Sequence, residues 1–283
     1  MRKLFFVSLV LFVTLPSFSQ LSKKEKKDER KQRINALIKQ EEEGVIAYNK
    51  HTAIGFKLTN DGYGGFLEVG RARSIKKVTL FQLDISERKH GKEDKQTNIS
   101  LPTSPFIFGK INYLYPVKLG VQQQILFGNK TNRNGVSVTG NFGGGISLAL
   151  LRPYNLEIND LNKGNRKLIR YESTDRTLYS GSGGSAGSYI ADSTLFTDGS
   201  ILSFLQVSGS GFGKGWGQMK VTPGIYGKAS MRFDYGQYNE MLNAIEVGLV
   251  GEIYSKKIPQ IVYAKPTQYF VSIYVSIMFG RRK

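Results

Sequence analysis

Few side chains in this sequence could carry acid–base or nucleophilic chemistry. There are two histidines, His51 and His90, and no cysteine among the 283 residues. Thiolates and clustered histidines hold most zinc ions, so the composition excludes such centres, and disulfides as well. His90 has Ser86 and Glu93 nearby, where a hydrolytic or acyl-transfer site could be assembled. A single histidine beside charged residues is weak evidence, and we expect no catalytic residue, cofactor or metal.

Charged and amide side chains instead recur at alternate positions within otherwise apolar segments. Alternation with a period of two places successive residues on opposite faces of a β-strand. Buried charges are tolerated only when paired, so we expect one closed network of ion pairs and hydrogen bonds inside a barrel. A gated proton or ion path is the alternative. The predicted inward-facing residues are Glu68, Asp84, Lys118, Gln122, Gln124, Lys228, Arg232, Glu246 and Glu252.

Eight alternating segments would position these residues. They are 54–59, 65–70, 79–86, 113–127, 136–150, 221–233, 245–253 and 269–279. Most are longer than the strands of soluble sandwiches, which average about five to six residues. Long strands in even number, continuously apolar on one face, are typical of bacterial outer-membrane barrels. The sequence therefore predicts an all-β fold, an eight-stranded antiparallel transmembrane up-and-down β-barrel over residues 51–281, with an N-terminal periplasmic helix.

The connections between these segments differ in length in a regular way. If the first strand starts in the periplasm, the outer connections are 60–63, 88–112, 153–217 and 256–267, and the inner turns are 71–76, 128–135 and 234–242. Apart from the first hairpin, the long connections fall outside, as outer-membrane barrels prefer. Both termini are then expected in the periplasm.

The N-terminal 50 residues divide into two parts. Residues 1–20 have the basic start, apolar run and small residues of a secretory signal peptide, with cleavage expected near Ser19 or Gln20. Residues 21–50 begin as a charged, helix-favouring arm. Ile34, Leu37 and Ile38 form a short apolar stripe on it, which predicts a periplasmic docking helix. A solvated tail without a partner is the alternative.

Basic residues dominate the chain, whose formal net charge is +18. Export makes nucleic acid an improbable partner, so an anionic membrane surface is the natural one. Lipopolysaccharide phosphates would suit the basic residues expected on the outer side, although ordinary solvated loops would also carry them. The candidate contacts are Arg88, Lys89, Lys92, Arg152, Lys163, Arg166, Lys167, Lys256 and Lys257.

The connection 153–217 is too long to be a bare linker. Glycine-rich runs at 179–188 and 209–217 enclose an apolar stretch around Ile201, Phe204 and Val207. This stretch could form a short helix or strand that caps the barrel mouth or meets another protein.

Three stretches carry a resemblance to known sequences: residues 41–49, 55–64 and 109–115. They resemble an uncharacterised family of outer-membrane proteins from the Bacteroidota, and the architecture is similar to the small OmpA/OmpX-like barrels. The resemblance implies the outer membrane of a Gram-negative bacterium but brings no activity and no catalytic residues.

These features favour a non-enzymatic role. Our leading hypothesis is a scaffold or accessory subunit of a larger outer-membrane assembly, of the secretion or barrel-insertion type. The expected partners are the outer membrane, its lipopolysaccharide, and other outer-membrane or periplasmic proteins. A lipid A- or phospholipid-modifying enzyme is the alternative, and a narrow channel is the third.

Overall fold

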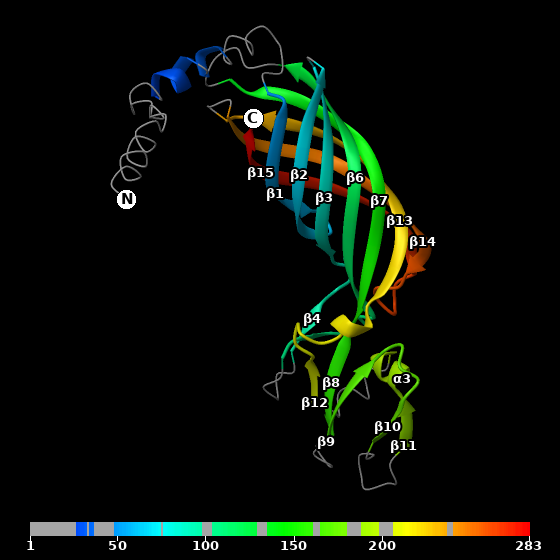
Figure 1. The fold of residues 1–283 in the computed structure, drawn as a ribbon. Helices are drawn as coiled ribbons and strands as arrows, with labels where there is room; N and C mark the ends of the chain where they lie inside the picture. The colour runs from blue at the N-terminus through cyan, green and yellow to red at the C-terminus, as the bar shows by residue number, and fades with distance from the viewer. Residues whose placement is uncertain are drawn as a thin grey trace, which may run out of the picture.

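The structure is a computed structural model that describes residues 27–32, 34–36, 48–74, 76–97, 104–128, 135–160, 165–179, 188–197, 206–236 and 240–283. Its main body is a closed barrel of eight antiparallel strands (Figure 1). The barrel strands are β1 (Lys50–Thr59), β2 (Gly62–Ser74), β3 (Lys77–Arg88), β6 (Asn112–Gly128), β7 (Ser137–Pro153), β13 (Lys220–Asp234), β14 (Met241–Ile258) and β15 (Thr267–Arg282). The sheet closes because β1 pairs with both β2 and β15. The antiparallel all-β architecture and the strand count predicted from the sequence are confirmed.

Side chains alternate between the inside and the outside along most of these strands, but the polarity is inverted relative to a soluble protein. In β1, Phe56 is 69% exposed on the outside, whereas the neighbouring Lys57 is 3% exposed on the inside. The same pattern continues around β15, where Val271 and Ile273 face outward and Ser272 faces inward. The barrel therefore has a polar lumen and an apolar outer surface.

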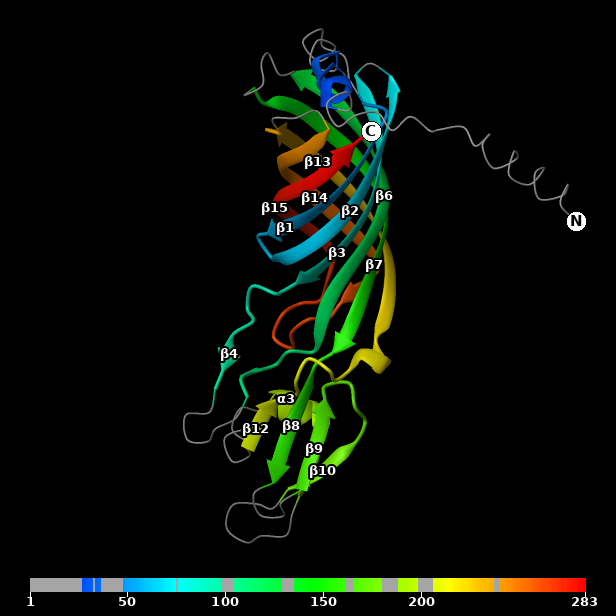
Figure 2. The same ribbon diagram turned by 60° about the vertical axis from the view of Figure 1, so that its left-hand side comes forward.

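The two ends of the barrel are built differently. The chain enters β1 and leaves β15 at one end, the proximal end, where His51 pairs with Arg282. The connections β2–β3, β6–β7 and β13–β14 also lie at this end and are short. Two long connections, 89–111 and 154–219, leave the opposite, distal end (Figure 2). This grouping matches the one expected from the sequence.

Part of the two long connections folds into a second body, the distal module. It contains a three-stranded sheet in the order β12-β8-β9, a hairpin of β10 and β11, a short pair of β4 and β5, and two short helices. The bounds are β4 (Lys95–Gln96), β5 (Phe106–Ile107), β8 (Asn155–Asp160), β9 (Asn165–Arg170), β10 (Arg176–Tyr179), β11 (Ser188–Ala191), α3 (Asp192–Thr197), β12 (Gln206–Gly209) and the 3-10 helix η1 (Trp216–Gln218).

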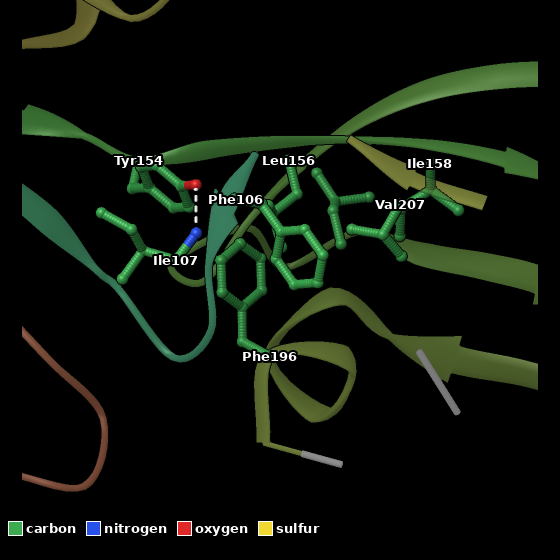
Figure 3. Packing of buried hydrophobic residues seen from close by; sticks show 8 residues of the cluster. Phe106, Ile107, Tyr154, Leu156, Ile158, Phe196 and Val207 are labelled. Atoms are coloured by element: carbon green, nitrogen blue, oxygen red, sulfur yellow. Dashed lines mark hydrogen bonds between the residues drawn. The ribbon is translucent and has the colours of Figure 1, made fainter. Parts of the chain in front are cut away.

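The distal module has its own hydrophobic core, shown in Figure 3. Phe106 and Ile107 come from the first connection and pack against residues of the second, and the Tyr154 hydroxyl accepts a hydrogen bond of 2.8 Å from the Ile107 N–H. The buried members are Phe106, Ile107, Tyr154, Leu156, Ile158, Ile169, Phe196 and Val207. Of the apolar stretch noted in the sequence, Val207 lies in strand β12, and residues 201–205 lie outside the described residues.

Little of the predicted N-terminal arm is described. Residues 27–32 and 34–36 are helical and mostly exposed, with Ile34 half-buried, and Arg30 pairs with Glu240 at 3.3 Å. Leu37, Ile38 and residues 1–20 lie outside the described residues. Of the helices that the structure describes, none is both long enough and apolar enough to cross a membrane.

Candidate functional site

The barrel lumen gathers all nine residues that the sequence placed inward. Each of Glu68, Asp84, Lys118, Gln122, Gln124, Lys228, Arg232, Glu246 and Glu252 is buried. They come from β2, β3, β6, β13 and β14, and the strand alternation turns each of them toward the barrel axis. Their contacts divide the lumen into a proximal and a distal cluster.

Arg232 is the centre of the proximal cluster. Its Nη1 and Nη2 donate to the two carboxylate oxygens of Glu68, each at 2.7 Å, and its Nε donates to Glu246 at 2.8 Å. The strand order places β13, which holds Arg232, across the barrel from β2, which holds Glu68. This two-pronged ion pair therefore crosses the full lumen. His51 Nε2 lies 3.0 Å from the same Glu68 carboxylate.

Glu246 completes the proximal cluster. Its carboxylate pairs with Lys228 at 2.8 Å and accepts hydrogen bonds from Asn141 at 2.9 Å, Ser230 at 3.1 Å and Tyr274 at 2.5 Å. Four strands thus meet on one side chain. A carboxylate with this many donors around it is fixed in place.

Glu252 holds the distal cluster together. Its carboxylate accepts a hydrogen bond of 2.8 Å from Lys118 and pairs with Arg88 at 3.0 Å. Arg88 also reaches Asp61 at 2.6 Å, so its guanidinium bridges two carboxylates. Both Lys118 and Arg88 lie on strands across the barrel from β14. Salt bridges therefore cross the lumen at this level too.

The described lumen is balanced in charge. Lys228 donates to Gln82 at 3.0 Å as well as pairing with Glu246, and Lys57 pairs with Asp84. An uncompensated charge would be costly here, and equal numbers of opposite charges satisfy that requirement. Six basic side chains of the described lumen, Lys57, Arg88, Lys118, Lys228, Arg232 and Arg282, face six carboxylates, Asp61, Glu68, Asp84, Asp234, Glu246 and Glu252.

Sequence reasoning left several members out of this network. Lys57, Gln82 and Tyr274 share the inward parity of the predicted set, so the alternation could have found them. His51 and Arg88 lie just beyond the ends of the segments that were read as strands. The further interior contacts not included in the predicted network are Asp61, Asn141, Ser147, Ser230, Tyr254 and Ser272.

The nine basic residues expected on the outer side do not form one surface. For Arg88 and Arg152 the expectation of an exposed outer position is wrong, because both side chains are buried. Arg88 ends strand β3 inside the lumen, and Arg152 lies among aromatic rings at the distal mouth. Arg166 pairs with Glu157 at 3.5 Å and Lys167 with Asp192 at 3.6 Å. The side chains of Lys89, Lys92, Lys256 and Lys257 are exposed. Lys163 lies outside the described residues.

His90 stabilises a turn in the connection 89–111. Its ring Nδ1 accepts a hydrogen bond of 3.1 Å from the Lys92 N–H, and its own N–H donates to Glu93 at 3.0 Å. Glu93 in turn pairs with Lys110 at 2.5 Å. Within the described residues, no hydrogen bond joins His90 to a serine side chain.

Comparisons with known proteins find distant structural likenesses and no sequence match. No known protein family matches the sequence, and no curated protein is significantly similar to it. Among solved structures, the chain is similar to Ail, the attachment invasion locus protein of Yersinia pestis, and to Ail in complex with the heparin analogue sucrose octasulfate. Both show 8% identity, cover 83% of this chain and 98% of the other, and have TM-scores of 0.32 and 0.31. Similarity at this level does not bear on function.

Proposed function

We propose that this chain is an integral β-barrel of a bacterial outer membrane. The observation that carries the proposal is the inverted polarity of the barrel, with charges inside and large apolar side chains outside. Soluble monomers rarely expose apolar patches larger than a few hundred Å². The outward-facing residues include Ile54, Phe56, Leu67, Phe81, Leu119, Phe142, Ile146, Ile225, Leu249, Val271, Ile273 and Ile277. A bilayer is the solvent that would cover them.

Closure of the barrel supports the same proposal. Within a bilayer every backbone N–H and C=O must find a partner inside the protein, which a closed sheet provides. The strands of this barrel run from 10 residues in β1 to 18 in β14. About 9 to 11 tilted residues are enough to span the hydrocarbon.

We place the proximal end in the periplasm and the distal module outside the cell. Short turns at one end and long connections at the other are usual for outer-membrane barrels, with the long ones outside. The signal-like residues 1–20 favour export as well. In this orientation the exposed Lys89, Lys92, Lys256 and Lys257 face the lipopolysaccharide side.

Within that membrane, we propose a non-enzymatic scaffold or accessory role in a larger assembly of the secretion or barrel-insertion type. The lumen is crossed by the Arg232–Glu68 and Arg88–Glu252 ion pairs, which disfavours a narrow channel. The distal module has a core of its own and so provides a shaped surface on one side of the membrane. The helical arm provides a second surface on the other side.

The first experiment is a fractionation of cells that express the chain with residues 1–20 intact. We expect the protein in the outer-membrane fraction, where it should show a heat-modifiable band on a gel run with and without boiling, because a closed barrel survives detergent until heated. A soluble periplasmic band without a heat shift would overturn the membrane proposal.

A second experiment tests the scaffold role: a tagged chain is purified from the same cells, and we expect a stoichiometric partner to accompany it. Purification of the chain alone would argue against the scaffold role while leaving the membrane barrel in place.

A further inference from the structure

A cavity of about 610 Å³ lies at the distal mouth, where the barrel meets the distal module. Its walls come from the ends of β3, β6 and β7, from the connection 89–111 and from residues 209–212. Small-molecule sites usually enclose about 300–1,000 Å³ and combine aromatic walls with a few placed polar groups. This cavity has that size and that composition.

Arg152 is the polar group that points to a ligand. It lines the cavity and is only 2% exposed, with its guanidinium carbon 4.2 Å from the ring centre of Tyr113 and 4.9 Å from those of Phe212 and Trp216. Its Nη1 donates to the Phe212 carbonyl oxygen at 2.6 Å. Its Nε has no hydrogen-bond partner, and no carboxylate of the described residues forms a salt bridge with it.

A buried guanidinium without a counter-ion is costly, and the surrounding rings offset only part of that cost. An anion in the cavity would supply the missing partner. Arginine binds phosphate and carboxylate groups with good geometry, because its N–H donors lie in one plane.

The rest of the lining strengthens the preference for an anion. Of the two acidic side chains, Glu93 is paired with Lys110 at 2.5 Å, and Glu87 accepts a hydrogen bond of 2.8 Å from the Tyr63 hydroxyl. Lys110 is itself buried. Four basic residues thus outnumber two acidic ones: Lys89, Lys95, Lys110 and Arg152 against Glu87 and Glu93.

The aromatic wall indicates what carries the anionic group. The rings of Tyr113 and Tyr115 are stacked with 6.3 Å between their centres, and Tyr115 stacks on Trp216 at 5.6 Å. Flat aromatic faces beside hydrogen-bonding groups suit a ligand with one apolar face and a polar rim. A sugar ring has this character, because its C–H bonds group on one face and its hydroxyls on the edge.

We propose that this cavity binds an anionic saccharide, namely a phosphorylated sugar of one or two rings. The phosphate accepts hydrogen bonds from Arg152 and from the lysines of the lining, and the ring lies against Tyr113 or Tyr115. The phosphosugar is either free in solution or part of a glycolipid headgroup. The site rests on the geometry of the cavity and not on the scaffold role.

The chain carries its own reporter for this site. Trp216 is the single tryptophan of the sequence, and its ring centre lies 4.9 Å from the Arg152 guanidinium carbon. The purified full-length chain in non-ionic detergent is titrated with glucose 6-phosphate, glucose and inorganic phosphate at matched ionic strength. We expect a saturable change in fluorescence, with glucose 6-phosphate bound at least about tenfold more tightly than either other probe. Glucose lacks the charge-assisted hydrogen bonds of the phosphate, and inorganic phosphate lacks the contact of the sugar ring with the aromatic wall. Equal affinity for all three probes, or no saturation, would overturn the proposal. Inorganic phosphate binding as tightly as glucose 6-phosphate would also overturn it.

Variants of basic residues inside and outside the cavity locate the site. Lys89→Gln combined with Lys95→Gln changes two exposed side chains of the lining and should leave the fold intact while weakening glucose 6-phosphate binding several-fold. Lys256→Gln combined with Lys257→Gln removes the same charge outside the cavity and should leave the affinity unchanged. Arg152→Lys keeps the charge but loses the planar donors and should weaken binding further. Equal affinities in all three variants would contradict the assignment.

A competition experiment identifies the source of the sugar. Lipopolysaccharide and its dephosphorylated form are each added to the glucose 6-phosphate complex. Displacement by the phosphorylated form alone supports a lipid-borne sugar. Displacement by neither supports a free phosphosugar, and equal displacement by both overturns the requirement for phosphate.

Discussion

Two buried arginines show how the same side chain is compensated in different ways. Arg232 donates to Glu68 and Glu246, so its charge is matched by carboxylates from two other strands. Arg152 has aromatic rings around it and a backbone carbonyl as its acceptor. The first arrangement is complete in itself and fits a structural role. The second is incomplete and fits a ligand.

The ion pair across the lumen should be essential for stability. Glu68→Gln leaves Arg232 with a single carboxylate partner and removes the charge that faces His51. We expect the free energy of unfolding in detergent to fall by about 3–5 kcal/mol, because breaking one side of a buried pair leaves a charge without compensation. Urea titration followed by the heat-modifiable gel shift measures this change.

An exposed ion pair provides the matched control for that variant. Arg30 and Glu240 form an ion pair at 3.3 Å near the surface. Glu240→Gln should lower the free energy of unfolding by no more than about 1 kcal/mol. A Glu68→Gln effect as small as the Glu240→Gln effect would mean that water enters the lumen and screens the proximal cluster.

Among the elements, β7 depends on close contact with its neighbour β6. A Cβ added to Gly145 would overlap the Leu119 carbonyl oxygen, whereas a Cβ at Gly227 on β13 would meet no atom within 4 Å. Gly145→Ala should therefore destabilise the barrel by about 1–3 kcal/mol, as overpacking does. Gly227→Ala should be neutral or slightly stabilising, because alanine restricts the unfolded chain. Equal unfolding midpoints for the two variants in urea would contradict the close packing of β6 and β7.

The strands could be predicted from the sequence, but their ends could not. A period of two marks a strand only where one face is apolar, so the segment expected at 65–70 stopped before Arg71 and Arg73, although β2 continues to Ser74. In the same way, the segment expected at 245–253 missed the part of β14 beyond the irregular pairing that follows Ile253. Regular alternation fails at the barrel rims, where outward-facing residues become polar.

The distal module and the position of Arg152 could not be predicted. The core joins Phe106 to Val207, about a hundred residues apart, and no periodicity in the sequence signals such a contact. The sequence placed Arg152 at an exposed site, but the rings of Phe212 and Trp216 lie over its guanidinium group. These two residues follow some sixty positions later in the chain, so no local pattern predicts the contact. Long-range packing rather than local pattern decides both.

The core of the distal module should show a distinct response to alkaline pH through Tyr154. Burial raises the pKa of its hydroxyl above the ordinary value of 10.0, because the charged form would lose its hydration. A raised pKa means that the folded state keeps a proton that the unfolded state releases. The stability associated with Tyr154 is therefore fully present below pH 10 and declines as the pH rises above it.

Tyr154→Phe isolates this contribution from those of other tyrosines. The variant leaves the Ile107 N–H without its acceptor and should lower the free energy of unfolding by about 1–3 kcal/mol at neutral pH. The difference in unfolding free energy between the two proteins should be constant up to about pH 10 and shrink above it, as measured by Trp216 fluorescence in urea. A difference that stays constant to pH 11.5 would contradict the burial of this hydroxyl.

At the scale of the whole molecule, polarity divides the chain into two environments. The barrel places apolar side chains outside and charges inside, whereas the distal module buries apolar residues in a core, as a soluble protein does. One chain with both arrangements fits a protein whose barrel is in lipid and whose distal module is in water. The division also fits the proposed display of a surface outside the membrane.

Two exposed leucines test this division directly. Leu249 lies in the middle of β14 and is 52% exposed, and Leu168 lies on β9 of the distal module and is 45% exposed. If both leucines faced water, replacing either one with arginine would change the free energy of unfolding by no more than about 0.5 kcal/mol. In a bilayer, Leu249→Arg places a charge near the midplane and should cost about 2–4 kcal/mol, while Leu168→Arg should remain neutral. Urea unfolding of both variants in phospholipid vesicles measures the difference. Equal stabilities would mean that the apolar belt of the barrel does not face lipid, and a partner protein would have to cover it instead.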